Sequence, residues 1–231
     1  MQQDYLTWLL GFQGFRVTKM ERIPDTHSHS RVKIHLERTL KGYICGGCGR
    51  RVSRGYDHTW QELHHLTLWH HHTVLRFQRF RVDCPHCGVQ TEALEFADIR
   101  GPRVTRMLAG LISELCKVMT VKAVATFQAL HPQTIRNIDK SALEKVQAER
   151  PLAGITVLGA DEISVGKGHN YWTLFSALEG PRGPEMLNIV AGRSERKLKK
   201  FWRWFGKDRT ARITHAVIDM SRSFEKSFRA H

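Results

Sequence analysis

The sequence has no long apolar run, few cysteines and few acidic side chains for its length. No stretch approaches the roughly 20 apolar residues of a membrane-spanning helix, and the N-terminus lacks the basic leader and apolar segment of a signal peptide. Five cysteines in 231 residues do not suggest a disulfide scaffold, and reduced thiols indicate the cytosol. We therefore expect a cytoplasmic protein.

The shortage of acidic residues leaves a large positive charge. There are 36 Lys and Arg against 22 Asp and Glu, which gives a formal net charge of +14. Such a surplus favours a nucleic acid as partner, because each phosphate that is neutralised releases condensed counterions. The competing interpretation is a solvated basic surface that aids solubility. The charged fraction of 25% is ordinary for a globular protein, so the charge does not indicate disorder.

Four of the cysteines form two Cys-x-x-Cys knuckles, Cys45 with Cys48 and Cys84 with Cys87. Four thiolates at this spacing bind zinc tetrahedrally and leave no position for water, so the zinc is expected to be structural. The alternatives are unrelated thiols or a redox pair. We assign no histidine of the His-rich interval between the knuckles to the metal. Cys116 lies in an apolar helical pattern and is expected to be a buried free thiol.

Periodicity divides the chain into three parts and predicts an α+β multidomain protein. Residues 1–97 alternate with a period of two, which predicts a β-rich, zinc-ribbon-like module. Residues 98–150 change to apolar spacings of three and four and predict a three-helix helix-turn-helix, in which Thr120 caps the second helix and Pro132 opens the third. Residues 151–231 show three strands, a helix and a strand, as in an incomplete RNase H-like α/β domain.

The third helix of the helix-turn-helix is expected to enter the major groove of DNA. Its polar side chains are candidates for contacts with base edges, although Arg136 can instead hold a phosphate. The alternative is that the three helices are only a structural linker. The candidate DNA contacts are Gln133, Thr134, Arg136, Asn137 and Lys140.

Two aspartates follow apolar strand signals in the last part of the chain. Asp161 follows the first of these strands, and Asp219 ends the apolar run 216–218. If the two strands lie side by side, the carboxylates converge and can hold Mg²⁺ for phosphodiester chemistry. Glu162 points to the opposite face because side chains alternate along a strand. The alternative places Asp161 in a surface turn and Asp219 at the cap of the last helix, and two aspartates alone do not decide between them.

Eight short segments carry a family likeness. They are Leu9-Leu10-Gly11, Arg79 to Pro85, Val124-Ala125 with Thr134-Ile135, Ile138-Asp139-Lys140, Gly159-Ala160-Asp161-Glu162, Lys167-Gly168-His169 with Tyr171, Gly192-Arg193-Ser194, and Val217-Ile218-Asp219-Met220-Ser221. Together with the order of the three parts, they resemble the DDE transposases of the bacterial insertion-sequence group called ISL-three, over nearly the whole chain.

The resemblance implies roles for the two aspartates and a partner. Asp161 and Asp219 would be the first two catalytic carboxylates, and they would bind Mg²⁺ for cleavage and strand transfer at insertion-sequence ends. The protein would be nucleoid-associated and would form a homo-oligomer on double-stranded DNA.

The sequence departs from the family pattern in two places. In the turn before the third helix, Ala129 replaces the usual Gly and His131 the usual capping Ser, and Ala129 is unfavourable if its φ is positive. The chain ends at His231, before the family's catalytic Glu, and Glu225 lies too close to Asp219 to replace it. We therefore expect a truncated transposase that is inactive alone. The alternatives are a non-catalytic zinc and helix-turn-helix DNA-binding protein that inhibits or regulates transposition, and a zinc-containing RNA-binding protein.

Overall fold

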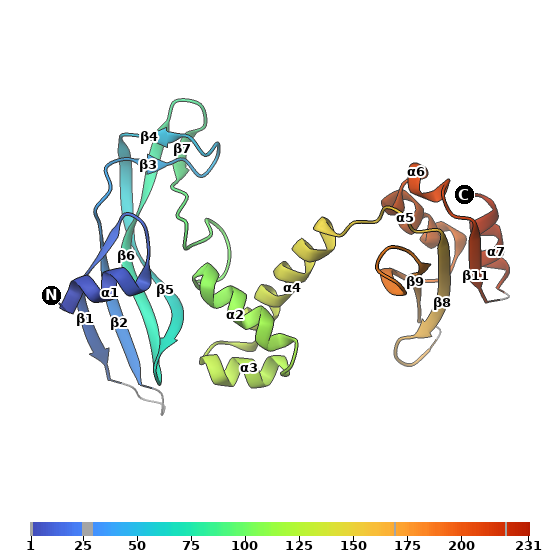
Figure 1. Cartoon of the computed structure of the whole chain (residues 1–231), viewed down its shortest axis with the longest axis horizontal. Coiled ribbons are helices and arrows are strands. Elements are labelled where there is room, and N and C mark those ends of the chain that lie inside the picture. The colour runs from blue at the N-terminus through green and yellow to red at the C-terminus, as the bar shows by residue number, and fades with distance from the viewer. Residues whose placement is uncertain (1, 25–29, 169, 220) are drawn as a thin grey trace. The chain divides into compact units, whose positions relative to one another are not determined.

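The structure is a computed structural model that describes residues 2–24, 30–168, 170–219 and 221–231. The protein is a mixed α/β chain that divides into two compact units, Met1–Ala148 and Glu149–His231 (Figure 1). Within the described segments, no helix combines the length and the hydropathy that a membrane span requires. Of the residues discussed above, His169 and Met220 lie outside the described residues.

The first unit contains a short N-terminal helix and a five-stranded sheet with the order β1-β2-β6-β5, in which β7 also pairs with β6. The pair β2–β6 is parallel, and the other pairs are antiparallel. The elements are α1 (Gln2–Leu10), β1 (Phe15–Ile23), β2 (Arg31–Arg38), β5 (Gly55–Leu68), β6 (His71–Cys84) and β7 (Gly88–Thr91). The predicted alternation is confirmed, because Val32, Ile34 and Leu36 of β2 are all buried on one face of the sheet.

Three helices follow in the same unit, α2 (Arg106–Cys116), α3 (Val121–Gln128) and α4 (Pro132–Glu149). They enclose a separate core that includes Ile112, Val124 and Ile135. As predicted, Thr120 caps α3: its side chain accepts a hydrogen bond of 3.2 Å from the backbone N–H of Ala123. Cys116 is half-buried at the edge of this core, so the expectation of a buried thiol is only partly met.

The connection between α3 and α4 is tight. α3 ends at Ala129, whose φ of 51° and ψ of 41° are left-handed, so the unfavourable conformation expected of an alanine there is present. His131 takes the place of a capping Ser, because its Nδ1 accepts a hydrogen bond of 3.1 Å from the backbone N–H of Gln133. The His131 cap therefore stabilises this turn, whereas the left-handed conformation of Ala129 is unfavourable.

The helices are attached to the sheet through β5. The backbone N–H of His64 donates to the carbonyl of Arg103 at 2.9 Å, and the N–H of Thr105 donates to the carbonyl of His64 at 2.8 Å. The imidazole Nδ1 of His65 lies 2.8 Å from the hydroxyl of Thr105, which also caps α2. Leu66 packs against the helical core. These contacts join sheet and helices into one body.

The second unit is a four-stranded sheet with the order β10-β9-β8-β11, covered on one face by helices (Figure 1). β11 is parallel to β8, and the other pairs are antiparallel. Its elements are β8 (Val157–Ser164), β9 (Tyr171–Glu179), β10 (Glu185–Ala191), α5 (Glu195–Phe205), α6 (Lys207–Thr210), β11 (His215–Ile218) and α7 (Arg222–Arg229). Phe175 of β9 stacks on Phe201 of α5 with their centroids 3.7 Å apart, and Phe224 of α7 is fully buried in the same core.

Candidate metal sites and nucleic-acid interface

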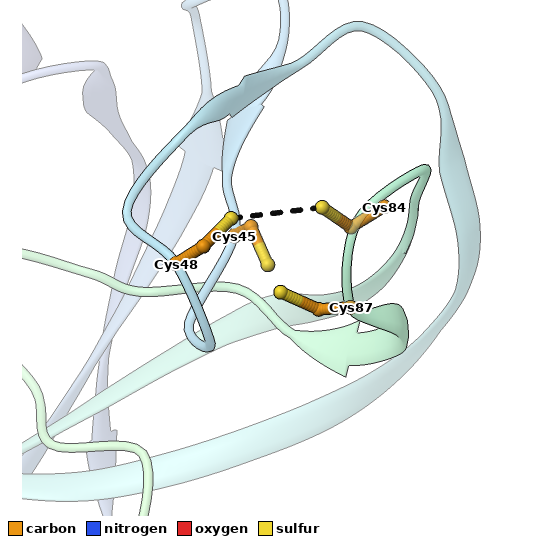
Figure 2. A group of neighbouring side chains, drawn as sticks. All are labelled: Cys45, Cys48, Cys84 and Cys87. Carbon is orange, nitrogen blue, oxygen red and sulfur yellow. Dashed lines mark hydrogen bonds between the residues drawn. The ribbon is translucent and has the colours of Figure 1, made fainter.

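The four predicted metal-binding cysteines lie together (Figure 2). Cys45 and Cys48 lie on the connection between β3 (Tyr43–Ile44) and β4 (Arg51–Val52), whereas Cys84 ends β6 and Cys87 immediately precedes β7. All four sulfurs lie within 4.8 Å of one another. The spacing of the two knuckles therefore predicted the cluster correctly.

The cluster has the dimensions of a tetrahedral thiolate site. Metal–sulfur bonds of about 2.3 Å in a regular tetrahedron separate the sulfurs by about 3.8 Å. The sulfurs of Cys48 and Cys84 are 3.7 Å apart. The N–H of Cys48 hydrogen-bonds Cys45 and is the main reason that the pKa of Cys45 falls to about 7. Four adjacent thiolates repel one another unless a cation lies between them, so the donor set fits a divalent metal such as zinc.

Backbone hydrogen bonds hold the two knuckles against each other. The N–H of Gly46 donates to the carbonyl of Thr91 at 3.1 Å, and the N–H of Ala93 donates to the carbonyl of Ile44 at 2.8 Å. Gly46 has no room for a side chain, because a Cβ there would lie 2.3 Å from the Thr91 carbonyl oxygen. The metal ligands are therefore brought together by main-chain pairing between segments that are distant in sequence.

Sequence reasoning missed the buried ion pair beside the knuckles. Glu92 is fully buried and pairs with the guanidinium of Arg38, and its Oε1 accepts a hydrogen bond of 2.9 Å from the N–H of Phe80. Arg38 also lies over the ring of Tyr43, 4.8 Å from its centroid. No pattern marked this pair, because its members are 54 positions apart, at the end of β2 and directly after β7.

The predicted DNA contacts lie in the first half of α4. Gln133, Arg136, Asn137 and Lys140 are exposed, and Thr134 is half-buried. The side-chain N–H of Gln133 donates to Oδ1 of Asn137 at 2.9 Å, which orients both amides along the helix. A shallow groove follows this surface, and its lining also includes two acidic residues. The residues of the groove are Gln133, Arg136, Asn137, Asp139, Lys140, Leu143, Glu144 and Gln147.

The two aspartates follow paired positions of neighbouring parallel strands. Ile218 of β11 pairs with Ala160 of β8, so Asp219 and Asp161 are the next residues along the two strands. The carboxylate of Asp161 is exposed, and its Oδ1 accepts a hydrogen bond of 2.7 Å from the N–H of Glu162. The two strands therefore lie side by side, which is the condition under which the sequence predicted that the two carboxylates converge.

Glu162 points to the other face. Its carboxylate lies 3.2 Å from the guanidinium of Arg193, and Arg193 lies over the ring of Tyr171, 4.2 Å from its centroid. Sequence reasoning placed Glu162 away from Asp161 but did not identify these partners. All three side chains belong to segments that carried the family likeness.

Two comparisons with known proteins agree with each other. Residues 158–231 match the ISL3-type family described as transposase. The transposase for insertion sequence element IS1001 of Bordetella parapertussis is 31% identical over 222 residues, which cover 96% of this chain and 53% of that protein. The chain therefore spans about half the length of this relative.

Proposed function

We propose that this chain, supported as an ISL3-type transposase by its family match and its 31% identical relative, binds insertion-sequence ends and takes part in their metal-dependent cleavage and strand transfer. The observation that supports a catalytic role is the parallel register of β8 and β11. Most of this register lies inside the family-matched segment, and it supports a placement of Asp161 beside Asp219. This half-sheet, with β8 to β10 antiparallel, β11 parallel and helices on one face, suits an RNase H-like domain.

The proposed metal site uses the carboxylates of Asp161 and Asp219. Carboxylate oxygens are the ligands that Mg²⁺ prefers, and bound Mg²⁺ would activate water or a 3′-hydroxyl and neutralise charge on the scissile phosphate. The N–H of Glu162 fixes one oxygen of Asp161 and leaves the other free for a ligand. Arg193 holds Glu162 on the far face, where its negative charge is already paired.

We assign the recognition of DNA to the first unit. We propose that α2, α3 and α4 act as a helix-turn-helix, in which Gln133, Thr134 and Asn137 face base edges and Arg136 and Lys140 approach phosphates. In this proposal residues 1–97 bind structural zinc, residues 98–150 recognise DNA and residues 151–231 belong to the catalytic domain.

Strand transfer joins separate DNA ends, so we also propose that copies of the chain assemble on DNA. Light scattering of the protein bound to a duplex of one insertion-sequence end would measure the number of chains per complex. A complex that holds a single chain at saturation would contradict this assembly.

The metal-dependent role is tested with Asp161→Asn. We expect the variant to lose Mn²⁺ binding, measured by electron paramagnetic resonance, while it keeps its affinity for duplex DNA of an insertion-sequence end. Asp208→Asn, on α6 of the same unit, is the matched control and should behave like the unmodified protein. Unchanged Mn²⁺ binding by the Asp161 variant would refute the proposed site.

A non-catalytic DNA-binding protein that regulates transposition is the second candidate. It is favoured by the first unit, which has its own hydrophobic cores and carries both the cysteine cluster and α4. This function predicts binding to insertion-sequence ends and no effect of Asp161→Asn on Mn²⁺ binding. Mn²⁺ titrations of the unmodified protein and of the Asp161 variant therefore separate the two candidates.

A further inference from the structure

The turn between β5 and β6 carries an unusual residue. Leu68 pairs with His71, so Trp69 and His70 form the whole turn. Trp69 is 83% exposed, and its backbone φ is 53°. The turn thus presents an indole at its tip.

Two separate features of Trp69 are unfavourable for folding. Two-residue hairpin turns need a positive φ at their first central residue, and Gly, Asn or Asp normally provides it, whereas a bulky side chain in this conformation is rare. An indole that is this exposed to water also gains little from the hydrophobic effect. Strained residues concentrate where the side chain has a role in function. A glycine at Trp69 would relieve both features, so the indole itself is the part to explain.

Cationic and titratable side chains surround this tip. The imidazole rings of His70 and His71 lie 3.9 Å apart, and Arg22 of β1 pairs with Val32 of β2, which in turn pairs with Thr73 of β6. Nδ1 of His71 lies 2.6 Å from the hydroxyl of Ser30. On the neighbouring strand Arg31 pairs with His72. The indole therefore projects from a surface that attracts anions.

Residues of β5 close to this turn contact the three-helix core. Three residues before Trp69, Leu66 packs against the helical core, and the main chain of His64 is bonded to the segment that leads into α2. At about 3.3 Å per residue, the fourteen residues of β6 place the turn about 43 Å from Cys84 at the other end of the strand. The turn thus lies at the end of β5 and β6 opposite to β7 (Figure 1), and Cys84 closes the other end of β6.

We propose that Trp69 is a base-stacking site, in which its indole stacks on an unpaired or unstacked DNA base while Arg22, Arg31 and the adjacent histidines approach the flanking phosphates. The proposal rests on the proposed function, because it takes DNA as the ligand. Every base has a flat apolar face that can stack on an indole, and the cationic surroundings match the phosphates on either side. An apolar side chain at a protruding tip can also enter a base step and open it.

The test compares two DNA probes of equal length, a fully paired duplex and a duplex with a forked, unpaired end, in binding titrations by fluorescence anisotropy. Trp69→Gly removes the indole and suits the turn. Loss of one base stack predicts about 5- to 150-fold weaker binding of the forked probe. Trp69→Phe retains a ring and should lose less affinity. Trp8→Ala on α1 is the matched control, because Trp8 is also 79% exposed, and should bind both probes as the unmodified protein does.

The outcomes distinguish this inference from the proposed function. If the unmodified protein binds neither probe, both proposals fail. If it binds the paired duplex and Trp69→Gly leaves its affinity for the forked probe unchanged, the stacking site is refuted and DNA binding stands. The melting temperature of Trp69→Gly should be equal to or above that of the unmodified protein. A lower value in both Trp69 variants, with matching losses on both probes, would assign the tryptophan a structural role instead.

Discussion

The left-handed Ala129 at the end of α3 gives a quantitative prediction. An alanine in this conformation is less stable than a glycine by about 1–2 kcal/mol, whereas a glycine gives the unfolded chain extra freedom worth about 0.4–1 kcal/mol. Ala129→Gly is therefore expected to stabilise the first unit by about 0.5–1 kcal/mol. For a unit of this size the melting temperature should rise by roughly 1–4 °C, measured by circular dichroism.

Alanine to glycine at Ala123, six residues earlier, should lower the melting temperature instead of raising it. Ala123 is inside α3, where glycine costs about 1 kcal/mol in helix propensity, and Ala123→Gly keeps the backbone N–H that Thr120 caps. We expect its melting temperature to fall by roughly 2–4 °C. If both variants shift the melting temperature in the same direction, the assignment of a left-handed helix end at Ala129 is wrong.

Two further predictions concern the metal and an ion pair. Chelation of bound metal should unfold the region around the knuckles, because the metal holds together segments distant in sequence; protease resistance that is unchanged after metal loss, verified by elemental analysis, would contradict this. The guanidinium groups of Arg150 and Arg182 lower the pKa of Glu185, so its contribution to stability is complete above its ordinary value near 4.5 and is lost as the pH falls below it. Urea midpoints at pH 7 and pH 3 should therefore differ less for Glu185→Gln than for the unmodified protein, and an equal difference would refute the coupling.

Local patterns predicted much of this molecule because the forces that set them are local. Alternation along β2 identified the buried face through Val32, Ile34 and Leu36, and the Cys-x-x-Cys spacing identified the cluster. Thr120 marked the start of α3 because a cap acts within one turn of helix.

Features that depend on long-range pairing were not predictable in the same way. The ion pair between Glu92 and Arg38 requires the end of β2 to meet the residue that follows β7. Trp69 lay between two strand-like runs, but nothing in its neighbours showed that it would occupy the left-handed turn position. The run 216–218 reads as a strand from its apolar residues, yet Val217 is 57% exposed, because among the described strands β11 is at the edge of its sheet and pairs with β8 alone.

The length of β6 sets a scale for any ligand that contacts both of its ends. Successive base pairs of a double helix rise by about 3.4 Å, so this one strand is as long as roughly 12 base pairs. A continuous duplex touched at once by the cysteine knuckles and by the tryptophan turn would have to extend over more than one full helical repeat. The shortest duplex that binds with full affinity would therefore show whether DNA contacts both ends of β6.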